Sequence, residues 1–224
     1  MIDVTVDLET CALCPTAAVM SIAAVAWKRY GKETPFFEDG DGVLRNPTFS
    51  AHVDLRSMFI NGFTFDKSTS EWWANQSDEA KAALLDNDGE DSPCLPIDVV
   101  VNDFFDWIGD IKKKLGDEDL CLWAQGTDFD VAILKHACYK MGIEFRIKHT
   151  QFRDHRTFYL EMARIIWDAA EPNEEKFSVE KAYSLTTDYK DITDEGAVHD
   201  PIFDCKRSIY STWQMMQKIR EVYA

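Results

Sequence analysis

Alternation of apolar and polar residues marks the first quarter of the chain. Residues 2–8, IDVTVDL, and residues 49–55, FSAHVDL, alternate with a period of two, and the apolar run 19–27 lies between them. Such patterns predict strands. The stretch 28–47 is rich in Gly, Pro and charge, which indicates a long hairpin connection. We therefore predict three strands that form an antiparallel meander.

Helical periodicity replaces this alternation in most of the remaining chain. Apolar residues three and four apart in 96–115 predict an amphipathic helix, and the apolar run 120–125 predicts a short buried strand. Ser70 and Ser77 are candidate N-caps for a helix in the segment 68–85. Further helices are predicted at 68–85, at 129–142 with its end at Gly142, at 156–169 and at 201–223.

Polar and mixed segments connect these elements. Residues 86–96 predict a polar loop, 145–154 contain one or two short strands, and 170–197 are acidic and irregular. Three meandering strands followed by alternating helices and strands predict an α/β or α+β sheet covered by helices. No repeat or long linker divides the sequence, so we expect a single domain over 1–224.

The composition favours a globular protein that makes no membrane contact. Hydrophobic residues make up 46% of the chain, and no apolar run reaches the ~20 residues needed to cross a bilayer. No signal peptide is visible, which suggests a cytoplasmic protein. The formal charge of −16 argues against a nonspecific nucleic-acid binder with a basic face. It does not exclude an enzyme that meets phosphate through divalent cations.

The six cysteines include one close pair, Cys11 and Cys14, in a C-x-x-C arrangement. A structural zinc site needs a second close pair of Cys or His, and the sequence has none. We favour reduced, mostly buried thiols. A thiol oxidoreductase that uses Cys11 and Cys14 is the alternative. That motif usually opens a helix, however, and Pro15 with the run after it gives weak helical support.

Asp7 and Glu9 form a D-x-E pair on the first predicted strand. Side chains two residues apart on a strand point to the same face. Two carboxylates on one face raise each other's pKa, and a bound divalent cation removes that cost. The pair therefore predicts half of a metal site, which needs further carboxylates.

Two more carboxylates stand at the ends of predicted elements. Asp130 opens the helix that follows strand 120–125, with Asp128 as a rival, and Asp204 lies in the first turn of the last helix. His199 comes just before that helix, so it can lie at the rim of the same site. Each of these residues also has an ordinary structural explanation, such as helix capping or a surface ion pair.

Together these motifs resemble a known family. The D-L-E-T stretch at 7–10, the F-D pair that ends at Asp130 and the His-x4-Asp pattern from His199 to Asp204 resemble the DEDDh 3′-to-5′ exonucleases. The stretches STSEWWANQS and RDHRT resemble the group that contains phage exonuclease A and the exoribonuclease RNase AS. The resemblance implies an RNase H-like fold, with a mixed sheet of five or six strands, three antiparallel strands first, and flanking helices.

The resemblance also implies a role for each residue of the site. Asp7, Glu9, Asp130 and Asp204 would bind two divalent cations, Mg²⁺ or Mn²⁺, and His199 would be the general base. The Phe before Asp130 matches the family's F-D pair, which favours this Asp over its rival two residues earlier. The enzyme would release nucleoside 5′-monophosphates from 3′ ends of single-stranded nucleic acid. DNA and RNA both remain open, and a catalytically silent nucleic-acid-binding protein of this fold is the alternative.

Four residues are candidates for contacts with the substrate. Leu8 and Thr10 flank Glu9, and the resemblance implies that they touch the 3′ nucleotide, although Thr10 equally suits an ordinary strand end. The adjacent Trp72 and Trp73 point roughly 100° apart on a helix. We expect one to be buried and the other partly open, where an indole beside the cleft can stack on a base. Two core or rim aromatics are the alternative.

Arg156, in the RDHRT stretch, suits a phosphate group, but it can instead pair with Asp154 or Glu161. We favour an ion pair that also shapes the cleft.

Many members of the family that this sequence resembles form dimers, so a homodimer is one open expectation for the oligomeric state.

Overall fold

Five strands form one mixed sheet in the part of the chain that the structure describes. The computed structural model describes residues 2–37, 44, 47–78, 80–81, 93–116, 119–169, 176–193 and 199–222. The strands are Ile2–Thr10 (β1), Val19–Trp27 (β2), Thr48–His52 (β3), Leu120–Ala124 (β4) and Phe152–Asp154 (β5). Their order in the sheet is β3-β2-β1-β4-β5.

β1 is the central strand and combines both kinds of pairing. It pairs antiparallel with β2, and β2 pairs antiparallel with β3. On its other side β1 pairs parallel with β4, which pairs parallel with β5. The predicted meander of three antiparallel strands is confirmed. The segment 145–154, where we expected one or two strands, contains β5 alone.

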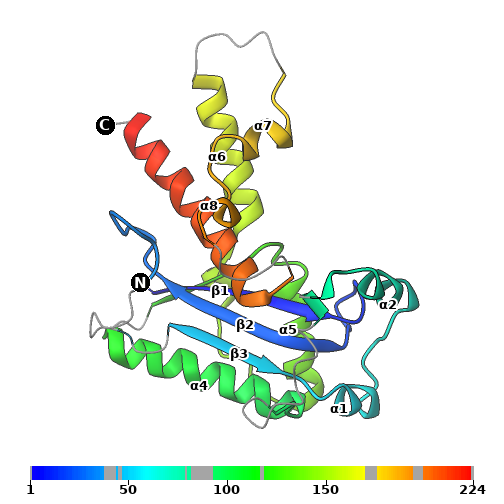
Figure 1. Cartoon of the computed structure of the whole chain (residues 1–224). Coiled ribbons are helices and arrows are strands. Elements are labelled where there is room, and N and C mark those ends of the chain that lie inside the picture. The colour runs from blue at the N-terminus through cyan, green and yellow to red at the C-terminus, as the bar shows by residue number, and fades with distance from the viewer. Residues whose placement is uncertain are drawn as a thin grey trace.

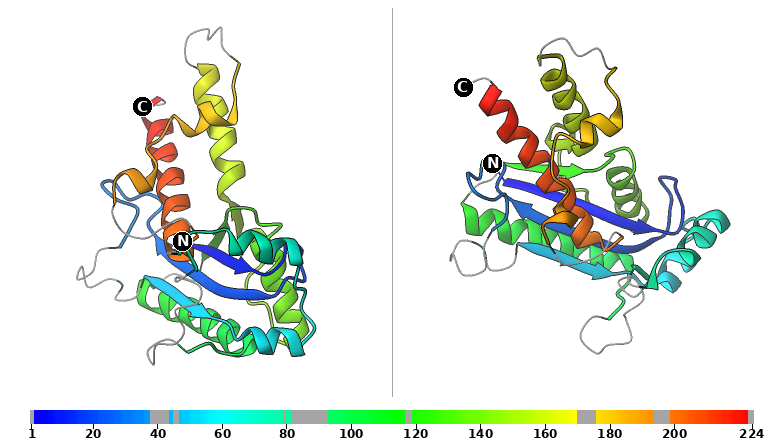
Figure 2. Two further views of the ribbon diagram at one scale, coloured as in Figure 1. Left: turned by 45° about the vertical axis from the view of Figure 1, so that its right-hand side comes forward. Right: turned by 45° about the horizontal axis from the view of Figure 1, so that its top comes forward.

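Helices cover both faces of this sheet (Figure 1). Their bounds are Leu55–Ile60 (α1), Lys67–Ala74 (α2), Ile97–Leu115 (α4), Asp130–Met141 (α5), His155–Ala169 (α6), Val179–Tyr183 (α7) and Pro201–Val222 (α8). α4 and α5 pack against one face, and α6 and α8 pack against the other. α6 and α8 extend side by side beyond the sheet, with α7 beside α6 (Figure 2). The α/β prediction is confirmed.

Alternation along β1 separates two packing layers. Its even-numbered residues, such as Val6 and Leu8, join the core beneath α4 and α5. Its odd-numbered residues point to the opposite face, where Trp27 and Trp123 form a second cluster with Ile209 of α8. From Ile2 to Glu9, every polar residue of β1 occupies an odd position. The face under α6 and α8 is therefore the one that receives the carboxylates of this strand.

A buried histidine links β1 to both helices on that face. Thr5 Oγ1 lies 2.8 Å from His155 Nε2, and His155 Nδ1 lies 2.7 Å from Thr212 Oγ1. Burial lowers the pKa of His155 to about 3, so the ring is neutral at ordinary pH. These contacts hold β1, α6 and α8 together two residues before Asp7.

The expected helix over 68–85 is shorter than predicted. α2 ends at Ala74, where the backbone N–H of Asn75 closes the last turn on Trp72 and Trp73 carbonyl groups. Residues 82–92, which include the end of that expected helix and most of the expected loop 86–96, lie outside the described residues.

The N-caps in this region also differ from the expected ones. Asp66 caps α2, because its side chain accepts a hydrogen bond from the backbone N–H of Thr69 at 3.0 Å. Ser70 therefore lies inside the helix. Ser77 Oγ accepts a bond of 3.1 Å from the N–H of Ala80, so this second candidate caps a separate turn after α2.

Two short helices were missed by the sequence analysis. The third strand ends at His52 instead of residue 55, and Asp54 then caps α1 by accepting a hydrogen bond from Arg56 N–H. The segment 170–197 contains α7 and the 3₁₀ turn Tyr189–Asp191, while 170–175 and 194–198 lie outside the described residues. No helix in the described part of the chain is long and apolar enough to cross a membrane.

A buried ion pair anchors the start of β1. Asp3 is 3% exposed, and Arg29 Nε donates to both of its carboxylate oxygens, at 3.1 and 3.2 Å. Trp123 Nε1 donates to Asp3 Oδ1 at 2.7 Å, and its ring centroid lies 5.1 Å from the Arg29 guanidinium carbon. Removing one partner therefore leaves a buried charge without its counter-ion.

We predict that Arg29→Ala lowers the free energy of unfolding by about 3–5 kcal/mol, because Asp3 loses its buried partner. Lys113→Ala is the matched control, since its ion pair with Asp110 is exposed and should contribute less than about 1 kcal/mol. Urea unfolding followed by tryptophan fluorescence measures both. Equal effects of the two substitutions would contradict the assignment of Asp3 and Arg29 as a buried pair.

Candidate active site

The end of β1 presents Asp7 and Glu9 to the face covered by α8. Asp7 is half-buried and Glu9 is 8% exposed. The register between β1 and β2 shifts between Glu9 and Thr10, so the strand is irregular immediately after the second carboxylate. Irregular strand pairing of this kind often re-aims a side chain beside a functional site.

Asp130 reaches the same place from the first turn of α5. Gly126 has φ of 121°, a conformation that favours glycine, and it turns the chain from β4 into that helix. Asp130 is buried, and its Oδ1 accepts a hydrogen bond of 3.2 Å from the backbone N–H of Leu8. Asp128 is exposed and is not among the described residues that line the pocket, whereas Asp130 is. The geometry thus favours Asp130 over its rival.

The start of α8 supplies Asp204 and His199. Asp200 caps the helix, because its Oδ1 accepts from the N–H groups of Ile202 and Phe203. Asp204 Oδ2 accepts a hydrogen bond of 3.0 Å from His199 N–H. His199 has φ of 72°, a left-handed conformation that is uncommon outside glycine. The Asp204 carboxylate therefore helps to hold a strained residue in place.

Two tryptophans of α2 flank the imidazole. The ring centroids of Trp72 and Trp73 lie 4.9 and 5.9 Å from that of His199, both edge to face. Trp73 Nε1 also donates to the carbonyl oxygen of Thr10 at 3.1 Å. Trp72 is 45% exposed and Trp73 is half-buried. Trp72 is thus the more open of the two, whereas Trp73 is half-buried where we expected a buried tryptophan, and both rings contact His199.

The gathered carboxylates resist ionisation. Burial and repulsion from its acidic neighbours raise the pKa of Asp7 well above its usual value. Burial, followed by repulsion from Asp204, raises the pKa of Glu9 to about 8. Burial raises the pKa of Asp130 to about 7 and also raises that of Asp204. Without a cation, Glu9 is therefore largely protonated at neutral pH, and Asp130 is protonated in about half of the molecules.

This donor set fits a divalent cation. One ligand atom each from Glu9, His199 and Asp204 lie within 4.8 Å of one another. Asp7 and Asp130 line the same pocket, and carboxylate oxygens are the ligands that Mg²⁺ and Mn²⁺ prefer. A cation placed among them would restore the charged forms of the carboxylates and remove their mutual repulsion.

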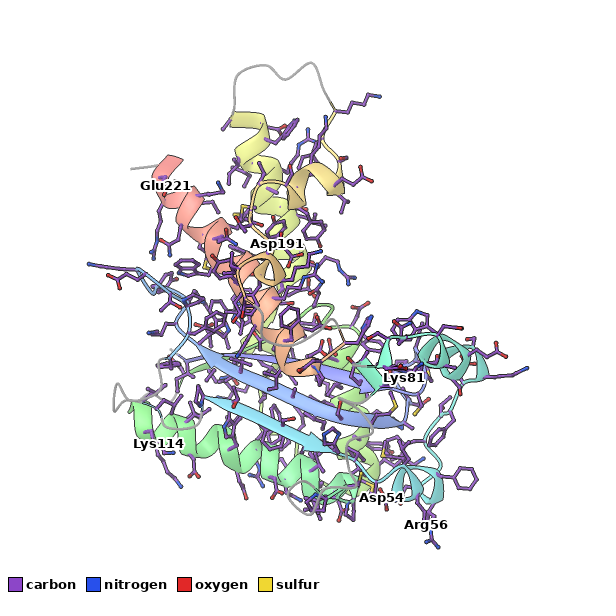
Figure 3. The ribbon with its side chains drawn as sticks, in the orientation of Figure 1. Asp54, Arg56, Lys81, Lys114, Asp191 and Glu221 are labelled. Atoms are coloured by element: carbon purple, nitrogen blue, oxygen red, sulfur yellow. The ribbon has the colours of Figure 1, made fainter. Side chains whose placement is uncertain are left out.

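The site opens into a pocket of about 940 Å³. Its walls away from the acids come from α6, α8 and the segment Tyr183–Asp191; Asp191 is labelled in Figure 3, in the part of the molecule above the sheet. Paired hydrogen bonds between Gln214 and the backbone of Thr187 fix this segment to α8. Sequence reasoning missed this wall, since residues 170–197 carry no periodic signal.

Comparison with known proteins identifies the chain. Residues 2–207 match the family described as the 3′-5′ exoribonuclease Rv2179c-like domain. The chain belongs to this family. It is also 27% identical over 212 residues to the exodeoxyribonuclease of Enterobacteria phage T4, across 93% of this chain and 86% of the phage protein. The protein is therefore a 3′-to-5′ exonuclease.

Solved nuclease structures share the exonuclease fold. Cell-death related nuclease 4 (CRN-4) matches with a TM-score of 0.55 and 16% identity, over 97% of this chain and 64% of CRN-4, so this chain spans less than two thirds of that protein. The nuclease domain of 3′hExo, a DEDDh family member bound to rAMP, matches with a TM-score of 0.54 and 13% identity, over 97% of this chain and 92% of that domain. The RNase H-like fold is confirmed.

The environment of Arg156 differs from our expectation. Arg156 lines the exonuclease pocket, and among the described residues neither Asp154 nor Glu161 forms an ion pair with it. The charge of Arg156 still helps to lower the pKa of Asp154, after the hydrogen bonds that its carboxylate accepts. Those bonds come from the backbone N–H groups of Thr127 and Thr157. The guanidinium is thereby left facing the pocket.

The remaining candidates lie at the end of β1. Leu8 is buried but lines the pocket, and the hydroxyl of Thr10 donates to the carbonyl of Ala12 at 2.8 Å.

Cys11 and Cys14, the C-x-x-C pair, are free thiols, and both are half-buried. Burial raises the pKa of Cys11 to about 11, whereas a hydrogen bond with a threonine hydroxyl lowers that of Cys14. Neither thiol belongs to a metal-ligand group among the described residues.

The raised pKa values predict how the metal-free exonuclease responds to pH. Between the usual pKa of Glu9, 4.5, and its folded value of about 8, the folded chain binds a proton that the unfolded chain has lost. Stability therefore falls as the pH rises through this interval. We expect the Tm in EDTA to drop on the order of 5 °C between pH 5 and pH 8.5, measured by calorimetry.

The matched control is the double variant Glu9→Gln/Asp130→Asn, which removes two of the titrating groups and should flatten this dependence. Excess Mn²⁺ should flatten it in the wild-type chain as well. A wild-type Tm in EDTA that stays level or rises over this interval would contradict the crowding of carboxylates described above.

Proposed function

We propose that this exonuclease removes nucleoside 5′-monophosphates from the 3′ ends of single-stranded nucleic acid, using two divalent cations, Mg²⁺ or Mn²⁺. The observation that carries the proposal is the convergence of Asp7, Glu9, Asp130 and Asp204 with His199 at one pocket. Four carboxylates that are buried or half-buried and have raised pKa values are costly to keep together unless cations bind them.

The four carboxylates would hold the cations. When bound, two such cations polarise the scissile phosphate and stabilise the charge that develops on the attacking and leaving oxygens. Asp130 and Asp204 are already oriented for this task by the backbone N–H groups of Leu8 and His199. Preorganised ligands of this kind lower the cost of assembling the charged site.

His199 is proposed as the general base. Its imidazole shares the site with the carboxylates of Glu9 and Asp204, within reach of a water between them. It would take a proton from that water as the water oxygen attacks phosphorus. The bond from phosphorus to the 3′ oxygen of the preceding nucleotide then breaks, and that oxygen leaves and gains a proton. The edges of Trp72 and Trp73 limit rotation of the imidazole.

Other residues in and beside the pocket are proposed to bind the strand. Trp72 is open enough to stack on a base, an interaction worth about 1–3 kcal/mol. Arg156 faces the pocket and can bind a phosphate through its guanidinium. Leu8 and Thr10, beside Glu9, are proposed to contact the terminal nucleotide. A cytoplasmic location and a homodimeric state stay predictions.

The sugar of the substrate is a separate question. The matching family is named for an exoribonuclease, and the phage relative is an exodeoxyribonuclease. Discrimination between the two depends on contacts with the 2′-hydroxyl. Only a direct comparison of matched substrates decides which nucleic acid this chain prefers.

We predict that the wild-type protein shortens 5′-labelled single-stranded oligomers stepwise in Mg²⁺ or Mn²⁺, and that EDTA stops it. Matched DNA and RNA oligomers, single- and double-stranded, resolved on sequencing gels, measure sugar and strand preference. Asp130→Asn should abolish the ladder, because the pocket loses a buried carboxylate. Asp128→Asn is the matched control and should leave the rate unchanged. Equal rates for the two variants would refute the assigned ligands.

We predict that His199→Ala lowers kcat by roughly 10²–10⁴, the usual contribution of a positioned general base. Single-turnover cleavage at saturating Mn²⁺ measures this rate. His136→Ala is the matched control, since that imidazole packs on Phe63 away from the pocket. A near-normal rate for His199→Ala would exclude a general-base role.

A further inference from the structure

One buried hydroxyl lies beside the carboxylates without a partner. Ser21, on β2, is 0% exposed, and its Oγ meets no hydrogen-bond partner among the described residues. A buried hydroxyl that makes no hydrogen bond costs about 1–3 kcal/mol. An unpartnered buried hydroxyl therefore needs an explanation, and one explanation is a hydrogen bond that forms only when cations are bound.

The sheet register places Ser21 directly beside Glu9. The two residues are cross-strand partners of β1 and β2, so their side chains project from the same face. Directly opposed side chains have Cβ atoms about 4.5–5.5 Å apart, within reach of a serine hydroxyl and a glutamate carboxylate. On the other side Ser21 is opposed by His52 of β3. Asp7, by comparison, is opposed by Ala23, which offers no donor.

Glu9 also differs from two other acids of the site. Asp130 and Asp204 each accept a hydrogen bond from a backbone N–H, of Leu8 and His199 respectively. In the described part of the chain, no donor reaches the Glu9 carboxylate. A glutamate has one more rotatable bond than an aspartate, so it needs a donor at least as much to fix its orientation.

We propose that Ser21 is a positioning residue that donates its hydroxyl proton to the Glu9 carboxylate when cations occupy the site. This inference rests on the proposed function. An ionised carboxylate has lone pairs in excess of those that a cation takes, and a charge-assisted hydrogen bond is stronger than a neutral one. The hydroxyl then fixes the orientation in which the Glu9 carboxylate binds a cation. The free-energy cost of burying the Ser21 hydroxyl is offset only when the metal is bound.

The substitution Ser21→Ala separates this role from a structural one. Removing an unpartnered buried hydroxyl should leave the Tm in EDTA unchanged or higher. The same change should weaken Mn²⁺ binding about 10-fold or more, since partners that orient metal ligands typically contribute 10–100-fold in affinity. Isothermal titration calorimetry of the full chain with Mn²⁺ alone measures affinity, and the half-saturating Mn²⁺ for cleavage should rise in parallel while kcat at saturating Mn²⁺ changes less.

Ser50→Ala is the matched control. Ser50 lies on the same face of the sheet, opposite Ala23, but is exposed, so its substitution should change neither Tm nor Mn²⁺ affinity. Unchanged Mn²⁺ affinity in Ser21→Ala would overturn the proposal, as would a fall in both affinity and Tm, which indicates a structural hydroxyl or one that serves His52. A wild-type chain that binds no Mn²⁺ would instead overturn the proposed function itself.

Discussion

Repulsion among buried carboxylates at the end of β1 is the constraint on which this structure depends. Asp7 and Glu9 project from one face of the central strand, and Asp130 and Asp204 approach from the first turns of α5 and α8. Both helices begin at the site, so the positive ends of their dipoles point toward the acids. Those partial charges relieve only part of the repulsion, because the pKa values stay raised. The remaining imbalance favours the cation binding that we propose for this site.

A closed chain of contacts holds the site together across elements that are distant in sequence. The indole N–H of Trp73 bonds to the end of β1 at Thr10, and the ring of Trp73 contacts His199. His199 donates its N–H to Asp204, whose helix packs back on β1 and β2. α2, which lies outside the two helical layers on the sheet, is therefore part of the site. A change in the position of α2 would reach the imidazole directly.

Local signals explain what could be predicted from sequence. The alternation of 2–8 identified both the central strand and the face that carries Asp7 and Glu9. The His-x4-Asp pattern from His199 to Asp204 and the Phe before Asp130 pointed to the helix starts that hold the other two acids. The stop at Ala74 and the helix at Leu55–Ile60 depend on caps, Asn75 and Asp54, that single positions signal only weakly.

Tertiary contacts explain what could not. The free guanidinium of Arg156 follows from the backbone N–H groups of Thr127 and Thr157 occupying Asp154, and no local pattern reveals that competition. The wall Tyr183–Asp191 is held by Gln214, about thirty residues later in the chain. Its position depends on α8 having docked already, so periodicity within the segment carries no information about it.

The charge distribution explains how a chain of formal charge −16 can serve a polyanion. Two cations on the pocket wall, Arg207 and Lys190, are partly neutralised, because both pair with Asp188. Arg156 has no such pair among the described residues, yet one guanidinium does not balance four carboxylates. In the proposed mechanism the attraction for phosphate therefore comes mainly from the divalent cations that these carboxylates bind. The acids thus act on phosphate indirectly, through the cations that their raised pKa values favour.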